Sequence, residues 1–373
     1  MSEALFSERY HDARKTFFEA VEGFESAVGR TARRHRFVVD EAEDLTIDAV
    51  EFEADTPQKL YVGIGGLHGL EGYMGSAVMR GMLAGPFRGI DFSKCGMLLV
   101  HGMNPWGFHN FRRVNANNVD LNRNFEIDGE PLYGSDSSGY QSLEHLLNPV
   151  AKVGGGAVER GVFFTNTLTA LLMRGMGPLR QATLSGQYAT PKGLFYGGAE
   201  AQQESVFYQG LLKRLAKDYG EILLTDLHTG YGARGQAYPL FPQADSPEFK
   251  EYAAQGVKDG GGSDKTYTAR GELVRYSYQT AKAANPGLVF NGLVVEVGTH
   301  GLGVVQQLKD LEIVVRENQA HHHGGSSDAV TAAARSAFRE FFYPTDPEWR
   351  RQSFEVVSER IESFLASRGF LSN

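Results

Sequence analysis

Apolar residues occur along this chain of 373 residues in two kinds of segment. Short, almost continuous apolar runs predict buried strands, whereas longer segments with apolar residues at helical spacing predict amphipathic helices. The expected strands span residues 36–40, 45–53, 60–64, 97–100, 222–226 and 292–297. The expected helices span residues 7–28, 73–84, 163–174, 201–219, 247–258, 327–341 and 347–367. Strands that alternate with helices and form continuous apolar runs are typical of an α/β sheet covered on both faces.

The length of the chain is compatible with one large domain or two ordinary ones. No internal repeat and no clean linker separates the expected elements. Residues 126–200 are rich in glycine and serine, and only the helix at 163–174 stands out within them. We interpret this stretch as an insertion rather than a domain boundary. The sequence therefore predicts a single domain over residues 1–373, with an insertion at about 126–200.

Charge, cysteine content and targeting signals narrow the classes of function. The 45 Asp and Glu residues exceed the 37 Lys and Arg residues, giving a net charge of −8, whereas general nucleic-acid binders carry a basic surplus. The single cysteine, Cys95, allows no disulfide within the chain and is expected to be a small core residue. No signal peptide is visible, and no apolar window reaches the ~20 residues of a membrane helix. We therefore expect a soluble, cytoplasmic protein without a nucleic-acid or membrane partner.

Side chains that can bind a metal follow two of the expected strands. His68 and Glu71 come after the strand at 60–64, and His228 follows the strand at 222–226. Open α/β sheets bind ligands beyond the carboxyl ends of their strands, so these side chains are expected at one edge. A lone His-x-x-Glu pair is often a surface turn, but the surrounding glycines permit a tight turn beside a ligand. Because a catalytic zinc takes three protein ligands and a water, the three side chains predict a zinc site.

Glu296 interrupts the apolar strand at 292–297. An ionised carboxylate in such a strand is costly unless it is paired or has a function. One interpretation is a glutamate in a salt bridge within the core. The interpretation we favour is a general base that takes a proton from an attacking water.

The loop after the strand at 97–100 combines Arg112, Arg113 and Arg123 with several asparagines, among them Asn122. A guanidinium beside an amide is suited to hold a substrate carboxylate. The alternatives are a solvated basic loop and an anion-binding surface for nucleic acid. The cluster is short, contains few aromatic residues and lies in an acidic chain, which argues against nucleic acid.

Four motifs occur in the order used by zinc carboxypeptidases, and the chain resembles that clan. The motifs are Gly66-Leu-His-Gly-Leu-Glu71, Asn118-Val-Asp-Leu-Asn-Arg-Asn-Phe125, Thr225-Asp-Leu-His228 and Val295-Glu296. The same clan includes aspartoacylase and succinylglutamate desuccinylase, and the whole chain is most similar to the bacterial DUF2817 branch. This resemblance implies a three-layer α/β/α fold with a mixed, mostly parallel central sheet.

The resemblance also implies roles for the matching residues. One zinc ion would be held by His68, Glu71 and His228. Glu296 matches the general base, which later acts as an acid toward the leaving amine. With no cluster of cysteine thiolates in the sequence, any zinc must be held by histidine and glutamate, which suits a catalytic site better than a structural one.

The substrate-binding residues implied by the resemblance are less uniquely matched. Asn122 and Arg123 match the pair that holds the terminal carboxylate of the substrate. Arg112 and Arg113 are both candidates for the arginine that polarises the scissile carbonyl, and the spacing to Arg123 slightly favours Arg113. Tyr276 and Tyr278 are both candidates for the tyrosine that the family carries on a mobile loop, and the flanking sequence does not choose between them. His321, His322 and His323, which match no motif, are expected in an exposed loop.

These observations predict a zinc-dependent hydrolase that cleaves an amide bond next to a free carboxylate. The substrate is expected to be a small peptide, which would make the chain a metallocarboxypeptidase. The alternative is an N-acyl amino acid, which would make it a deacylase of the aspartoacylase type. A non-catalytic binding protein on the same fold is a third reading, although the three metal ligands and the base are all present. The sequence permits a homo-oligomer without indicating one.

Overall fold

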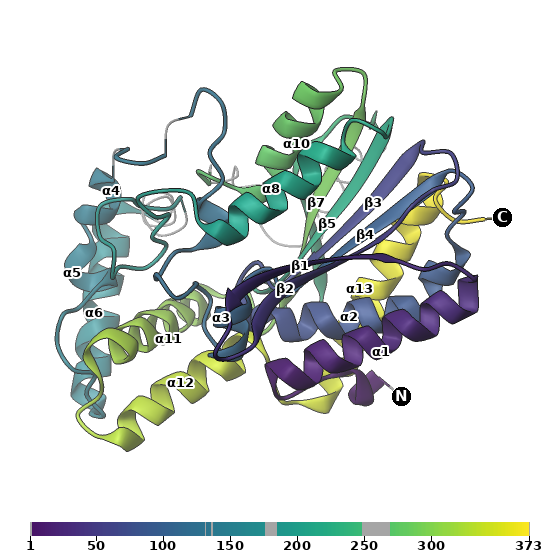
Figure 1. Ribbon diagram of the computed structural model, residues 1–373. Coiled ribbons are helices and arrows are strands. Elements are labelled where there is room, and N and C mark those ends of the chain that lie inside the picture. The colour runs from purple at the N-terminus through teal and green to yellow at the C-terminus, as the bar shows by residue number, and fades with distance from the viewer. Residues whose placement is uncertain (1, 131, 136, 176–184, 248–268, 373) are drawn as a thin grey trace.

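A seven-stranded sheet forms the centre of the computed structural model, which describes residues 2–130, 132–135, 137–175, 185–247 and 269–372 (Figure 1). The strands lie in the order β1-β2-β4-β3-β5-β7-β6. Their bounds are Arg33–Asp40 (β1), Leu45–Phe52 (β2), Lys59–Gly65 (β3), Cys95–His101 (β4), Glu221–Gly230 (β5), Ala237–Ala244 (β6) and Val289–Gly298 (β7). The four central strands β4, β3, β5 and β7 are parallel, and the pairings of β1, β2 and β6 are antiparallel.

Helices cover both faces of this sheet. One face packs against α1 (Tyr10–Val28), α2 (Gly72–Ala84), α12 (Asp328–Phe342) and α13 (Pro347–Ser367), and the other against α8 (Gln203–Leu215) and α10 (Leu273–Ala284). Alternation along β3 shows why both faces are apolar. Tyr61 belongs to the core on the α2 side, whereas Leu60 and Val62 belong to the core on the α8 side. The predicted three-layer α/β/α fold with a mixed sheet is confirmed.

A smaller group of helices lies at one end of the sheet, on the left of Figure 1. It contains α11 (Val304–His323) and, from the proposed insertion, α4 (Ser138–Gln141), α5 (Glu144–Leu147) and α6 (Ala157–Arg174). A separate small core joins the insertion to α11, with Tyr140, Leu143, Leu147, Leu194 and Phe195 packed around Val315. The remaining helical turns are η1 (Ser2–Leu5), η2 (Gly69–Glu71), η3 (Pro86–Gly89), α3 (Pro105–His109) and η4 (Leu121–Arg123).

Most of the expected elements are present, with a few differences. The helix expected at 247–258 lies almost wholly outside the described residues. The sequence did not predict α10, α11 or β6. The expectation of an exposed loop at His321, His322 and His323 was wrong, because these residues form the last turn of α11 and are partly buried, and the helix ends at Gly324. Cys95 opens β4 and is buried, as expected. No helix in the described part of the chain is long and apolar enough to cross a membrane.

Candidate metal centre

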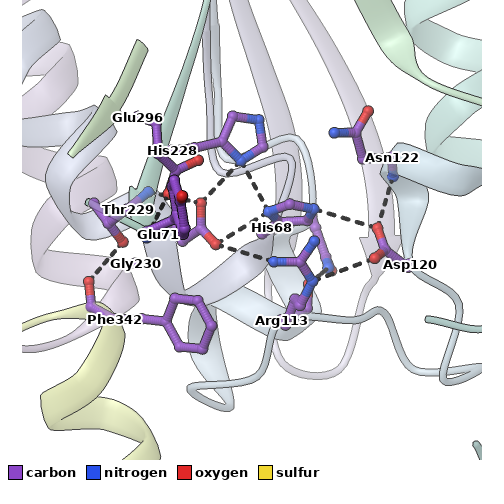
Figure 2. A network of polar contacts seen from close by, with 12 residues as sticks. His68, Glu71, Arg113, Asp120, Asn122, His228, Thr229, Gly230, Glu296 and Phe342 are labelled. Carbon is purple, nitrogen blue, oxygen red and sulfur yellow. Dashed lines mark hydrogen bonds and ion pairs between the residues drawn. The ribbon is translucent and has the colours of Figure 1, made fainter. Parts of the chain in front are cut away.

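The side chains of His68, Glu71 and His228 meet at the carboxyl ends of β3 and β5, where His68 and Glu71 follow β3 and His228 lies near the end of β5 (Figure 2). Nδ1 of His228 lies 2.9 Å from Nδ1 of His68 and 3.0 Å from Oε2 of Glu71. Nδ1 of His68 lies 3.0 Å from Oε1 of Glu71. One ligand atom from each residue lies within 4.8 Å of the others, and all three residues are buried. The structure therefore brings the three predicted residues together.

A tight turn after β3 brings His68 and Glu71 to the same side. Gly66 adopts a φ of +79°, a backbone conformation that residues other than glycine rarely take. A Cβ atom at Gly69 would lie 2.2 Å from the carbonyl carbon of Gly107, so the turn fits against α3 only with glycine at this position. The short helix η2 then follows, and its three residues set the spacing between the two ligands.

Two further carboxylates orient the imidazole rings. Nε2 of His228 lies 2.7 Å from Oδ2 of Asp226, and Nε2 of His68 lies 3.3 Å from Oδ1 of Asp120. The Nε2 atom of each ring faces an aspartate, and Nδ1 of each ring is thereby directed toward Glu71 and is the nitrogen available to a metal. Sequence reasoning assigned no role to either aspartate, although both lie inside the recognised motifs. The available signal was the Asp-x-His spacing on β5, which puts Asp226 and His228 on one face of the strand.

The charges at the centre favour a bound cation. Burial alone would raise the pKa of Glu71, but the two histidines outweigh it and hold that pKa far below its usual value. Burial would lower the pKa of His228, but Asp226 and Glu71 raise it well above the ordinary range. Two imidazole nitrogens and one carboxylate are also the donor set of a catalytic zinc that keeps a position open for water. The residues present therefore fit a zinc ion.

Glu296 lies beside this centre. It is the direct partner of His228 in the parallel pairing of β5 with β7, and its Oε1 accepts a hydrogen bond from the backbone N–H of Tyr231 at 3.0 Å. Burial, together with the negative charge of Glu71, raises the pKa of Glu296 to about 7. A carboxylate with this pKa takes up and releases a proton near neutral pH, which is the property that a general base requires.

The structure separates the roles of the two adjacent arginines. Nη1 of Arg113 lies 3.6 Å from Oε1 of Glu71, and its Nε donates to Asp120 at 3.2 Å. Arg112 points elsewhere, because its Nε donates to Glu317 on α11 at 2.9 Å and its Nη2 donates to Asn318 at 3.1 Å. Only Arg113 of the pair therefore reaches the candidate centre, whereas Arg112 joins the loop to α11.

Asn122 and Arg123 lie in η4, directly after Asp120, and both are buried. The backbone N–H of Asn122 donates to Oδ1 of Asp120, and the side-chain Oδ1 of Asn122 accepts from the N–H of Leu273 at the start of α10. Figure 2 shows Asn122 above Asp120, with Arg113 to the left of that aspartate. The amide oxygen of Asn122 is therefore engaged by α10, whereas no hydrogen bond to another described residue holds its amide nitrogen, which can face a ligand.

The two candidate tyrosines belong to helix α10 rather than to a loop. Tyr276 is buried with its ring 5.4 Å from that of Phe125, and its hydroxyl has no hydrogen-bond partner among the described residues. Tyr278 packs against Phe290 on β7. No contact in the described part of the chain joins either ring to the three candidate ligands.

A family model described as "Protein of unknown function (DUF2817)" matches residues 6–356. The chain belongs to this family. No curated protein matches this DUF2817 chain. Among solved structures it is similar to bovine thrombin-activatable fibrinolysis inhibitor, with 13% identity over 89% of this chain and 96% of that one and a TM-score of 0.43.

Two further solved structures resemble the DUF2817 chain at low identity. Carboxypeptidase A from Helicoverpa armigera is 14% identical over 85% of this chain and 71% of that one, with a TM-score of 0.42. A succinylglutamate desuccinylase/aspartoacylase family protein from Shewanella amazonensis is 16% identical over 78% of this chain and 72% of that one, with a TM-score of 0.37. At these identities and TM-scores the similarities assign no activity to this chain.

Proposed function

We propose that this DUF2817 chain is a zinc-dependent hydrolase that cleaves an amide bond next to a free carboxylate. The observation that carries the proposal is the meeting of His68, Glu71 and His228 with Glu296 on the neighbouring strand. A buried His₂Glu donor set beside a glutamate with a pKa of about 7 is the arrangement that metal-assisted hydrolysis needs.

His68, Glu71 and His228 would hold a single zinc ion. Bound there, zinc acts as a Lewis acid and lowers the pKa of water to about 7. Asp226 and Asp120 keep the two imidazoles oriented, so the ligands are fixed before the metal arrives. Glu71 is in addition held by the backbone N–H of Thr229, which donates to its Oε2 at 3.0 Å.

Glu296 is the residue that moves protons. In its ionised form it accepts a proton from the water that attacks the scissile carbonyl, and it then donates that proton to the leaving amine. A pKa of about 7 suits both steps, because the same group must accept and release a proton at the same pH. The N–H of Tyr231 fixes one carboxylate oxygen and leaves the other to act.

Arg113 and the Asn122–Arg123 pair bind the substrate on either side of the scissile bond. Arg113 supplies a fixed positive charge for the oxygen that becomes negative in the tetrahedral state. Asn122 and Arg123 hold the free carboxylate, because a guanidinium and a neighbouring amide can both donate directional hydrogen bonds to its oxygens. The C-terminus of a peptide carries such a carboxylate, and the activity we favour is therefore that of a metallocarboxypeptidase. An N-acyl amino acid carries the same carboxylate and is the alternative substrate.

A substrate screen with the zinc-loaded protein tests the proposal. The panel would contain N-blocked dipeptides that vary at the C-terminal residue and a matched set of N-acyl amino acids. Glu296→Gln is the inactive variant, and Glu22→Gln on the exposed side of α1 is the matched control. Release of a free amino acid that is lost in Glu296→Gln and kept in Glu22→Gln supports the proposal. The absence of bound zinc by elemental analysis, or equal turnover by Glu296→Gln, would refute it.

A further inference from the structure

The last part of the insertion, residues 186–200, packs over the loop that carries Arg113, Asp120 and Arg123. The backbone N–H of Asp120 donates to the carbonyl of Tyr196 at 2.7 Å, and the hydroxyl of Tyr188 donates to the carbonyl of Arg123, also at 2.7 Å. A Cβ atom at Gly186 would lie 2.8 Å from Cδ of Arg123, so the packing is close as well as hydrogen-bonded. This segment therefore forms one wall behind the residues proposed to bind substrate.

Phe195 is the residue of this segment that contacts a proposed catalytic group. Cζ of Arg113 lies 5.7 Å from the centre of the Phe195 ring, within the range of a cation–π interaction. The backbone of Phe195 has a φ of +56°, a conformation in which a bulky residue is an outlier. Glycine or asparagine would satisfy this backbone at lower cost, and strain of this kind is retained where the surrounding structure requires the side chain.

We propose that Phe195 is a positioning residue that holds the guanidinium of Arg113 in the orientation needed to stabilise the tetrahedral oxygen. The proposal rests on the function proposed above, because that function gives Arg113 its role. Asp120 binds Nε of the guanidinium and Glu71 lies near Nη1, on opposite sides of the group in Figure 2. The ring of Phe195 adds a contact of a different kind, since it attracts the cation through its π face without a hydrogen bond and so restrains its orientation further.

Phe195→Leu and Phe195→Tyr form the matched pair for the test. Leucine keeps most of the apolar volume and removes the π face, whereas tyrosine keeps the π face. We expect Phe195→Leu to lower kcat by roughly 10-fold, as the loss of a partly desolvated cation–π contact implies, with KM unchanged. Phe195→Tyr retains most of the activity. Leu147→Ala, which truncates a side chain of the same small core away from Arg113, controls for a general loss of stability.

A second measurement does not depend on catalysis. In protein labelled with ¹⁵N-arginine, the Nε–H signal of Arg113, assigned from its loss in Arg113→Lys, should show the ring-current shift of an aromatic neighbour. We expect that shift to disappear in Phe195→Leu and to remain in Phe195→Tyr and Leu147→Ala. If the hydrolase assay fails but the shift behaves in this way, the proposed function is wrong and the contact stands. An unchanged signal in Phe195→Leu, or an equal loss of kcat in Leu147→Ala, overturns the role of Phe195.

Discussion

His228 and Glu296 are direct partners in the register of the parallel strands β5 and β7. Paired residues on parallel strands project their side chains to the same face, so one strand contributes a candidate metal ligand and the next contributes the candidate base. Asp226 precedes His228 by two residues on that face and binds the other side of the imidazole ring. Asp226, His228 and Glu296 thus all lie on strands of the central sheet, and no loop is needed to bring them together.

Asp226→Asn tests the first part of this arrangement. The amide keeps the size of the carboxylate but loses the charge that orients and polarises His228. We expect the affinity for zinc to fall about 10- to 100-fold, as is typical when a partner of a metal-binding histidine is removed. Competition with a chromophoric chelator measures this affinity. Asp218→Asn, at an exposed position that precedes β5, is the control, and zinc binding by Asp226→Asn as tight as in the unmodified chain would contradict the assignment.

The pKa of Glu296 predicts the pH dependence of turnover. Glu296 is active as a base only when ionised, and burial beside Glu71 raises its pKa to about 7. The value of kcat/KM should therefore rise with pH, by about tenfold per unit on the acidic limb, and level off once Glu296 is ionised. A bound cation favours the ionised form, so zinc places the end of this limb at or below pH 7. Activity measured from about pH 5 to pH 8 that shows no acidic limb would exclude Glu296 as the base.

Zinc should stabilise the fold, and this effect should grow with pH. The pKa of His228 is raised in the folded chain, so without zinc its contribution to stability is fully present below about pH 6.5 and is lost as pH rises through the raised value. Zinc competes with that proton for His228, so the affinity for zinc increases as pH rises and the proton leaves. At a zinc concentration of 100 times Kd, the gain is about 2.7 kcal/mol. Thermal unfolding with zinc and with EDTA measures it, and His68→Ala should show no zinc-dependent shift at any pH.

The central strands and their ends could be predicted because each strand is marked by the residues within it and directly beside it. The apolar runs of β3, β4, β5 and β7 are short and bounded by polar residues, and parallel strands bring their carboxyl ends to a common edge. The order of β1, β2 and β6 in the sheet depends on pairings far apart in the sequence, which a local pattern does not contain. Helix α11 was missed for a related reason, because its buried face is partly polar: Val315 packs in the small core with the proposed insertion, whereas Glu317 and Asn318 bind Arg112.

The sequence could not predict which of the two side chains, Arg112 or Arg113, faces the candidate metal centre. Adjacent residues in a loop share composition and spacing, and the direction of each side chain is set by the backbone before it. Here Phe111 adopts a φ of +54°, and the two following side chains diverge. Arg112 then meets a carboxylate more than two hundred residues away in sequence. No motif in the sequence pairs Arg112 with Glu317, so both arginines remained candidates until the structure separated them.

The buried ion pair between Arg112 and Glu317 yields a final prediction. Both side chains are buried, and burial raises the pKa of Glu317 even though Arg112 opposes that rise. Arg112→Met removes the partner and leaves a buried acid, which typically costs about 3–5 kcal/mol of unfolding free energy. The double variant Arg112→Met with Glu317→Leu replaces the pair by apolar side chains and should recover most of this loss. Urea unfolding of the single and double variants measures both effects.

The same variants separate a structural arginine from a substrate-binding one. If Arg112 only joins the loop to α11, the double variant should keep the KM of the unmodified chain, because Arg113 remains against Glu71 and Asp120. Arg113→Lys should instead lower kcat by about 10²- to 10³-fold with little loss of stability, since lysine keeps the charge but lacks the fixed fork of donors. A double variant that regains its stability but shows a strongly raised KM would identify Arg112 as a substrate-binding residue. In that case the rise in KM would come from a lost contact with the substrate, because the fold of the double variant is as stable as that of the unmodified chain.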